Sequence, residues 1–116
     1  MQLHWMKCQG DVWCKLSTVN LEHQHFNDME GVYIIWHGGE NAATVKVGHG
    51  NIRSRLYAHR QDASIQAYND LGLFVTWARV PLQFRDGVET FLGTRLKPKV
   101  GDRFPNVPPV EVNFPW

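Results

Sequence analysis

Five side chains that can carry charge or transfer protons are spaced along the middle of the chain. Tyr33 lies in a run of β-branched and aromatic residues, and Lys46 lies in the next such run. Arg55 precedes His59 by four residues, so a helix would place both on one face. A guanidinium offers a fixed fork of donors to an anion, and the carboxylate of Glu89 is the oxygen ligand that Mg²⁺ prefers. This set is suited to holding a metal ion and an anionic substrate while a proton moves.

A tyrosine such as Tyr33 can serve as a general base only with assistance. An unperturbed tyrosine titrates near pH 10, so it is a poor base at neutral pH. A cation within a few ångströms favours the phenolate, and Lys46 on the neighbouring run is placed to supply one. The alternatives are that Tyr33 is a buried cross-strand aromatic and that Lys46 is a surface lysine.

The hydrophobic pattern of the first half predicts a hairpin followed by a helix. Residues 31–36 and 43–47 are β-branched and aromatic runs, and turn residues separate them. They predict an antiparallel hairpin over residues 31–47. Asn51 is a good N-cap, and it predicts a helix over about 52–67.

The second half adds one strand and one helix. The run 73–80 predicts a third strand, which Pro81 stops. A helix is expected to open at Asp86 or Gly87 and to end at Pro98. The order β-β-α-β-α predicts an α+β fold in which helices flank a small, three-stranded, mostly antiparallel sheet.

Length and composition predict one domain, with the candidate chemistry in residues 31–98. Residues 1–30 form an N-terminal extension, and the proline-rich residues 99–116 predict an extended, irregular tail. No apolar run approaches the roughly 18 residues of a membrane span, which excludes an integral membrane protein. With no export signal, we expect a cytoplasmic protein whose Cys8 and Cys14 are reduced.

The net charge of +1 hides an uneven distribution of charge along the chain. Residues 44–61 carry four basic residues and no acid, and residues 79–103 carry six basic and three acidic residues. Two basic segments that converge in space would suit a polyanion. Alternatively, each is a solvated face.

In this order the residues resemble the GIY-YIG nuclease family. Gly31-Val32-Tyr33 stands for the first tripeptide, and Lys46-Val47-Gly48 stands for the second. The segment from Asn51 to His59 is similar to the family's helix, and Glu89 matches its metal-binding glutamate. The resemblance covers about two thirds of the chain. The family usually has tyrosine where Lys46 stands, but some restriction-enzyme-like members have a similar lysine with a nearby histidine, which His49 would match.

The resemblance implies a metal-dependent endonuclease that hydrolyses phosphodiester bonds in nucleic acid, with DNA more expected than RNA and Mg²⁺ or Mn²⁺ as cofactor. Tyr33 would be the base, Lys46 its modulator, Arg55 the contact to the scissile phosphate and Glu89 the metal ligand. His49 and His59 are candidates for contacting the nucleophile or phosphate, against a structural role for each. The candidate nucleic-acid contacts are Arg53, Arg60, Lys97, Lys99 and Asn106.

Three function classes stay open at this point. The first is the endonuclease, which predicts that Tyr33, Lys46, Arg55 and Glu89 line one concave face. The second is a non-catalytic nucleic-acid-binding module on the same fold, and the third is a protein-interaction domain or a different enzyme that uses similar hairpin geometry. Because 116 residues leave no room for a separate DNA-reading domain, sequence specificity would require another domain, a partner or a homo-oligomer.

Overall fold

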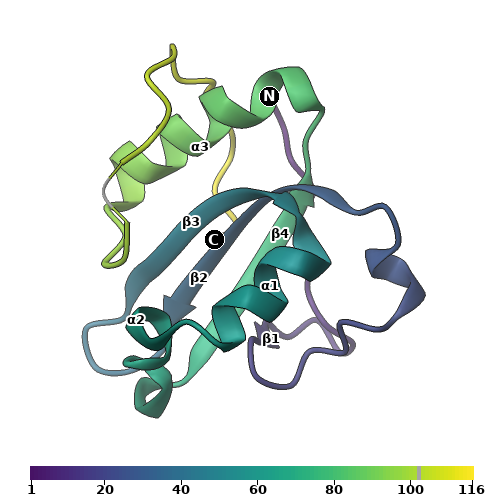
Figure 1. The fold of residues 1–116 in the computed structure, drawn as a ribbon, viewed down its shortest axis with the longest axis vertical. Helices are drawn as coiled ribbons and strands as arrows, with labels where there is room; N and C mark the ends of the chain where they lie inside the picture. Colours follow the sequence, from purple (N-terminus) through teal and green to yellow (C-terminus); the bar gives the residue numbers. More distant parts are fainter. Residues whose placement is uncertain (102) are drawn as a thin grey trace.

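The structure is a computed structural model that describes residues 1–101 and 103–116. It contains one antiparallel sheet with the strand order β1-β4-β2-β3 (Figure 1). The α+β class is confirmed, but the sheet has four strands where three were predicted. The extra strand is β1, a two-residue segment too short to show any alternating pattern. The strands are β1 (Cys14–Lys15), β2 (Glu30–His37), β3 (Ala43–Asn51) and β4 (Leu73–Arg79).

The helices differ from the prediction at their ends. The expected helix over 52–67 is two helices, because the first ends at Arg60 and Asp62 caps a new one through the Ser64 amide. Asn51 caps the first helix as predicted, since its side chain accepts from the Ser54 amide. The last helix begins directly after Pro81, earlier than the expected start at Asp86. The helices are α1 (Ile52–Arg60), α2 (Ala63–Gln66) and α3 (Leu82–Leu96), with 3-10 turns η1 (Gln24–Phe26) and η2 (Asn69–Leu71).

The register of the β2–β3 hairpin determines which side chains share a face. Tyr33 lies opposite Gly48, and Ile35 lies opposite Lys46. The register shifts between Ile35 and Trp36, so the hairpin contains an irregularity of the β-bulge type near its turn. Directly paired residues share a face of the sheet. Tyr33, Lys46 and Gly48 therefore belong to the same face.

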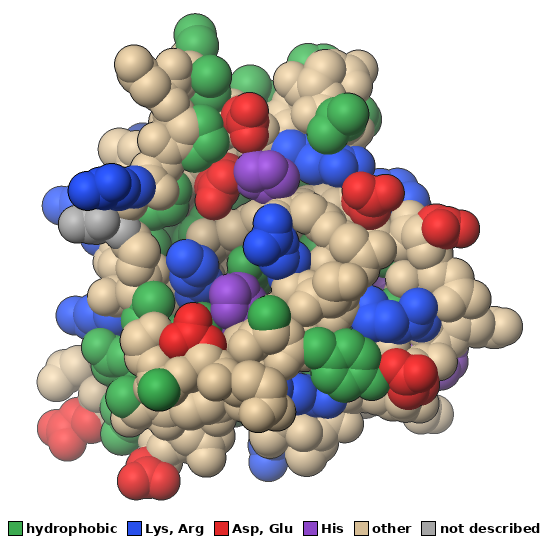
Figure 2. Space-filling view, viewed as in Figure 1, with side chains coloured by type: hydrophobic (Ala, Val, Ile, Leu, Met, Phe, Trp, Pro, Cys, Tyr) green, Lys and Arg blue, Asp and Glu red, His purple; other side chains and the backbone are tan. Residues whose placement is uncertain are grey.

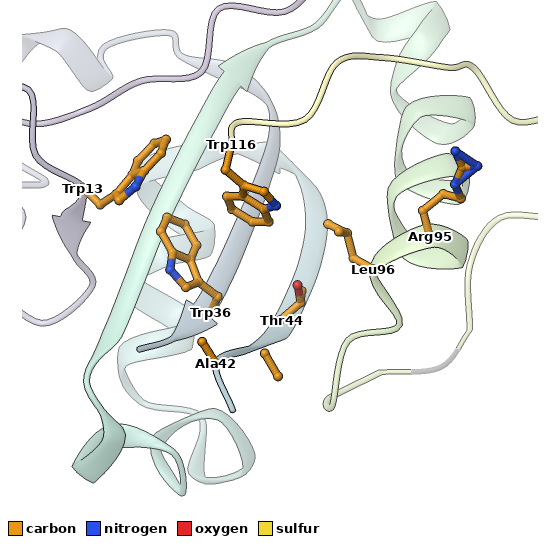
Figure 3. Close-up of a pocket in the computed structure, with 8 residues that line it drawn as sticks. Trp13, Trp36, Ala42, Thr44, Arg95, Leu96 and Trp116 are labelled. Atoms are coloured by element: carbon orange, nitrogen blue, oxygen red, sulfur yellow. The ribbon is translucent and has the colours of Figure 1, made fainter. Parts of the chain in front are cut away.

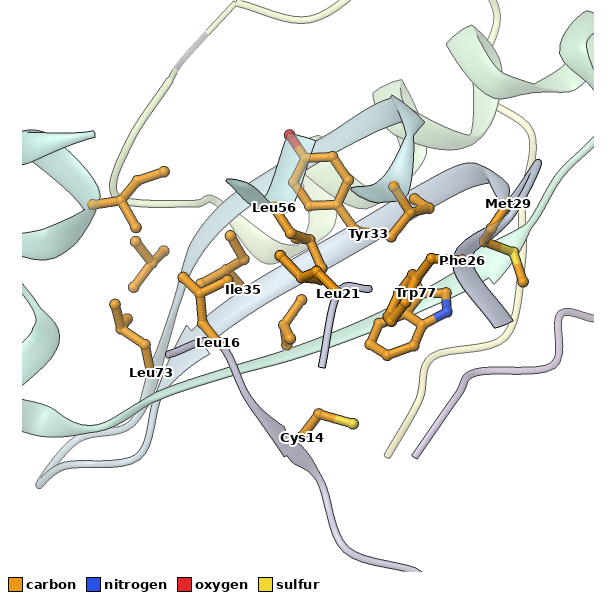
Figure 4. Close-up of a cluster of buried hydrophobic side chains, with 14 residues drawn as sticks. Cys14, Leu16, Leu21, Phe26, Met29, Tyr33, Ile35, Leu56, Leu73 and Trp77 are labelled. Atoms are coloured by element: carbon orange, nitrogen blue, oxygen red, sulfur yellow. The ribbon is translucent and has the colours of Figure 1, made fainter. Parts of the chain in front are cut away.

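Two buried clusters hold helices on opposite faces of this sheet. On one face, Tyr33 and Ile35 pack with Ile52 and Leu56 of α1 (Figure 4). On the other face, Val32, Ile34 and Val47 pack against Val88 and Leu92 of α3. The sheet is thus sandwiched between α1 and α3, and β3 is its edge strand on the side away from β1.

The N-terminal extension is pinned by a disulfide between Cys8 and Cys14. The expectation of reduced thiols was wrong for this structure. The chain reverses at Gly10 and Asp11, which both have positive φ, and Cys8 pairs with Val12 in an isolated bridge. This reversal brings the two cysteine Cα atoms to 5.1 Å, within the range a disulfide requires.

The tail is extended and carries no helix or strand in its described residues, 99–101 and 103–116, as predicted. Its first part runs beside β3, where the amides of Lys99 and Val100 donate to the carbonyls of Thr44 and Val45. Its end buries Val112 in the cluster under α3. Among the described residues, no helix is long and apolar enough to cross a membrane.

Candidate active site

The hydroxyl of Tyr33 reaches the edge of the sheet because Gly48 lies beside it. A Cβ on residue 48 would overlap the Tyr33 hydroxyl, so any other residue there would displace the ring. Gly48 belongs to the edge strand β3, and the missing side chain lets the phenol cross that strand. The tripeptide spacing noted in the sequence therefore has a steric meaning, which is that glycine makes room for the tyrosine.

Tyr33 and His59 form a buried hydrogen bond between Oη and Nε2, with a length of 2.5 Å. Burial, followed by the charges of Lys46 and Arg55, lowers the pKa of His59 to about 4, while Asp62 acts in the opposite direction. The imidazole is therefore neutral at pH 7, and its Nε2 can accept the hydroxyl proton of Tyr33. His59 of α1, one of the residues predicted from the sequence, thus contacts Tyr33 directly.

The pKa of Tyr33 is raised well above its usual range. Burial is the main cause, the charge of Arg55 opposes it, and the charge of Glu89 adds to it. The sequence had led us to expect that Lys46 lowers the pKa of Tyr33, and this was wrong. Lys46 instead acts on the pKa of His59, and its ammonium lies against Gly101 of the tail, where a Cβ would come within 2.7 Å of Nζ.

Arg55 lies exposed in α1 and covers a second glycine of the edge strand. A Cβ on Gly50 would come within 3.0 Å of Arg55 Nε, and Gly50 has a φ of 132° that side-chain-bearing residues rarely adopt. Arg55 therefore stands over the backbone of β3, close enough to Tyr33 to oppose its raised pKa.

On the other side of β3, His49 meets two carboxylates of α3. His49 Nδ1 lies 2.6 Å from Glu89 Oε2, and His49 Nε2 lies 3.5 Å from Asp86 Oδ1. One ligand atom from each of the three residues lies within 4.8 Å of the others. The group is suited to a divalent cation, since it combines an imidazole with two carboxylates. The sequence indicated Glu89 as a ligand. It did not indicate that His49 would contact Glu89 and not Tyr33.

Tyr33, Lys46 and Arg55 lie on the α1 side of the sheet but Glu89 does not, so the expectation that all four line one concave face was wrong. Tyr33 belongs to the cluster under α1, whereas α3, which carries Glu89, packs on the opposite face. The two groups approach around the edge strand, because the charges of both Arg55 and Glu89 act on the pKa of Tyr33. In Figure 2, histidine, basic and acidic side chains gather on the face between α1 and α3.

Two arginines proposed as nucleic-acid contacts have structural partners instead. Arg53 donates to the backbone carbonyls of Leu21 and His23, and Arg60 donates to that of Leu16. These guanidiniums tie the N-terminal extension to α1, which leaves few of their donors for a phosphate. The basic composition of residues 44–61 could not show this, because the partners are backbone groups distant in sequence.

The remaining predicted contacts lie beyond the end of α3. Lys97, Lys99 and Asn106 are all exposed. Lys97 ends α3 in the left-handed conformation, and the Lys99 amide pairs with Thr44 at the start of β3. Thr44 precedes His49 by five residues, or about 16 Å along a strand. Lys99 is therefore placed toward the opposite end of β3 from His49.

No protein-family model, curated protein or solved structure matches the chain. The chemistry that is possible at the edge of β3 therefore follows from the residues that lie there. Tyr33 and His59 can pass a proton along their hydrogen bond, Arg55 can hold an anion, and Glu89 with its neighbours can hold a cation.

Proposed function

We propose that the chain is a metal-dependent endonuclease that hydrolyses phosphodiester bonds in nucleic acid, in the manner of the GIY-YIG nucleases. The observation that carries this proposal is the hydrogen bond between Tyr33 and His59, and the charges of Arg55 and Glu89 both act on the pKa of the same hydroxyl. A base, a cation for the phosphate and a metal ligand are the three parts that such a hydrolysis needs.

Tyr33 acts as the general base through His59. The attacking water gives its proton to Tyr33 Oη while the hydroxyl proton passes to His59 Nε2, so that no free phenolate has to form. The low pKa of His59 keeps its imidazole neutral and ready to accept. A phosphate bound beside Lys46 and Arg55 neutralises the charges that depress this pKa, which makes His59 a stronger base when substrate is present.

Arg55 holds the scissile phosphate in place. Its exposed guanidinium, above Gly50, can contact two phosphate oxygens at once and stabilise the charge that develops on them. The exposure of Arg55 beside the buried Tyr33 gives the substrate an approach from the solvent side of β3. In this arrangement Lys46 supplies a second positive charge rather than a direct contact with Tyr33.

Glu89 is the proposed metal ligand, with His49 and Asp86 beside it. Two carboxylates suit Mg²⁺ or Mn²⁺, and the imidazole suits Mn²⁺ better than Mg²⁺. A bound ion would polarise the phosphate and stabilise the leaving oxygen. DNA as substrate, a cytoplasmic location, and a separate domain, partner or second copy that supplies specificity are further parts of the proposal.

A non-catalytic nucleic-acid-binding module is the second candidate, and one observation favours it. Only 2% of the surface of Tyr33 is exposed, and burial raises its pKa. A phenol that water does not reach would leave a basic face that binds phosphates without cleaving them. The two candidates differ in turnover and not in binding.

The proposal is tested by incubating the purified chain with labelled single-stranded, duplex and branched DNA and RNA, with and without Mg²⁺ or Mn²⁺. Cleavage that requires metal is expected. Glu89→Gln should abolish it while binding is kept, and Glu40→Gln, an exposed acid in the turn before β3, should cleave normally. Binding without cleavage on every substrate supports the second candidate. Equal cleavage by the wild type and Glu89→Gln contradicts the metal role of Glu89.

A further inference from the structure

A pocket of about 580 Å³ opens near the turn of the β2–β3 hairpin, beside the paired residues Trp36 and Thr44. Three indoles and the last turn of α3 surround it (Figure 3). Its volume falls in the range of sites that hold small ligands. The lining residues are Trp13, Trp36, Ala42, Ala43, Thr44, Arg95, Leu96 and Trp116.

The three tryptophans are arranged around Trp36. Trp36 packs edge-to-face with Trp13 at 5.3 Å and with Trp116 at 5.2 Å, and it stacks on Phe74. Trp116 leaves 59% of its surface exposed, although it belongs to this aromatic group. An exposed indole beside two others is a large apolar surface that the described chain does not cover, and such surfaces mark binding sites.

The charge around the pocket is positive. Arg95 lines it with its stem while its guanidinium lies over the ring of Phe91, and none of the eight lining side chains is acidic. Lys97 and Lys99 follow on the same segment and are exposed, and the Lys99 amide bonds to the carbonyl of Thr44 in the pocket wall. Indole faces next to a row of cations are the combination by which proteins hold single-stranded nucleic acids, since bases stack and phosphates pair.

We propose that this pocket binds unstacked nucleobases of a single-stranded nucleic acid, with the indole of Trp116 as the stacking platform. The ligand class rests on the proposed function, because a nuclease site on β3 makes nucleic acid the expected partner. A duplex does not fit this role, since its bases already stack on one another. Arg95 and the exposed Lys97 would contact the flanking phosphates.

The pocket and the candidate active site lie on the same strand. Thr44 is in the pocket wall, paired with Trp36 on the α3 side of the sheet, and His49, which meets Glu89 on that side, follows five residues later. That separation is about 16 Å along an extended strand. A few nucleotides span this length, so the pocket would hold a single-stranded end of a substrate whose phosphate lies near His49 and Glu89.

The test is the binding of a labelled single-stranded oligonucleotide, in EDTA so that no metal-dependent cleavage occurs. We expect quenching of the intrinsic tryptophan fluorescence, and about tenfold weaker binding for Trp116→Ala. Trp116→Phe should stay within about threefold of wild type, since phenylalanine still stacks. Leu82→Ala, which removes another exposed apolar side chain, should bind as wild type does.

A second variant keeps the test valid if Trp116→Ala alters folding, which thermal melting would show. Arg95→Gln should weaken binding and lower the slope of log affinity against log salt by about 1. Wild-type affinity for both Trp116→Ala and Arg95→Gln overturns the inference, as does equal loss of single-strand and duplex binding. Binding that depends on Trp116, with no cleavage under any metal, supports the nucleobase pocket and contradicts the nuclease. Cleavage together with unchanged binding by both variants supports the nuclease and contradicts the nucleobase pocket.

Discussion

The hydroxyl of Tyr33 and Nε2 of His59 lie 2.5 Å apart, joined across 26 positions of sequence by the packing of α1 on β2. Both groups are buried, and the direction of each pKa leaves both neutral at pH 7. The phenol is therefore the donor and the imidazole the acceptor. This direction is the one that a proton leaving Tyr33 would follow.

The depressed pKa of His59 makes stability depend on pH. Its folded pKa of about 4 lies below the model value of 6.5, so the unfolded chain binds more protons between these values. Stability from this group is complete above about pH 6.5 and is lost as pH falls toward 4, by about 3 kcal/mol in total. Urea unfolding at pH 7 and pH 4.5 measures the loss. His59→Gln should remove most of that pH dependence, and an unchanged dependence would contradict the assignment.

Lys46 should influence His59 rather than Tyr33. Its positive charge is among the causes that lower the pKa of His59, so Lys46→Met should raise that pKa toward 6.5. The titration of the His59 ring protons by NMR measures this shift directly. Lys15→Met, at an exposed position of β1, is the matched control and should leave the titration unchanged. A His59 pKa that does not move in Lys46→Met would show that the two groups are not coupled.

Gly48 should be intolerant of any side chain. A Cβ at this position overlaps the Tyr33 hydroxyl, so Gly48→Ala must displace the ring and break its bond to His59. We expect a loss of about 1 to 3 kcal/mol in the free energy of unfolding. Gly39→Ala is the control, because the atoms nearest to its Cβ belong to the side chain of the exposed Leu71, which can move. Equal unfolding free energies for the two variants would refute the close approach.

The hairpin and the start of α1 could be predicted because local signals specify them. Runs of β-branched and aromatic residues form β2 and β3, and Asn51 caps α1 with its own side chain. The place of β1 in the sheet could not be predicted, since its two residues pair with β4, far along the chain. The break after Arg60 has a local signal in Asp62, an N-cap residue that the helical spacing obscured.

The sequence indicated which residues could belong to a site but not how they pair. Tyr33, His59 and Glu89 stay candidates, and the sequence could not show that α1 and α3 occupy opposite faces. Because of that arrangement, the side chain of His49 contacts Glu89 and lies on the other face of the sheet from Tyr33. The only sequence signal for the group on α3 was the spacing of three between Asp86 and Glu89, which places both on one side of a helix.

The Cys8–Cys14 disulfide has a direct chemical test. Labelling of the unfolded, unreduced chain with a thiol reagent should modify neither cysteine, and labelling after reduction should modify both. A loop this short should contribute about 2 kcal/mol to stability, so reduction should lower the melting temperature. Two reactive thiols in protein purified without reductant would instead restore the expectation of reduced cysteines.

Tyr33 is proposed to accept the proton of the attacking water, and single-turnover cleavage by Tyr33→Phe measures this role most directly. The assay uses the best substrate found for the wild type, at saturating protein and metal. We expect a rate lower by about a hundred- to ten-thousand-fold, with substrate binding unchanged. Tyr57→Phe, which removes an exposed hydroxyl from the same helix as His59, should cleave at the wild-type rate. A Tyr33→Phe protein that cleaves as fast as the wild type would contradict the account.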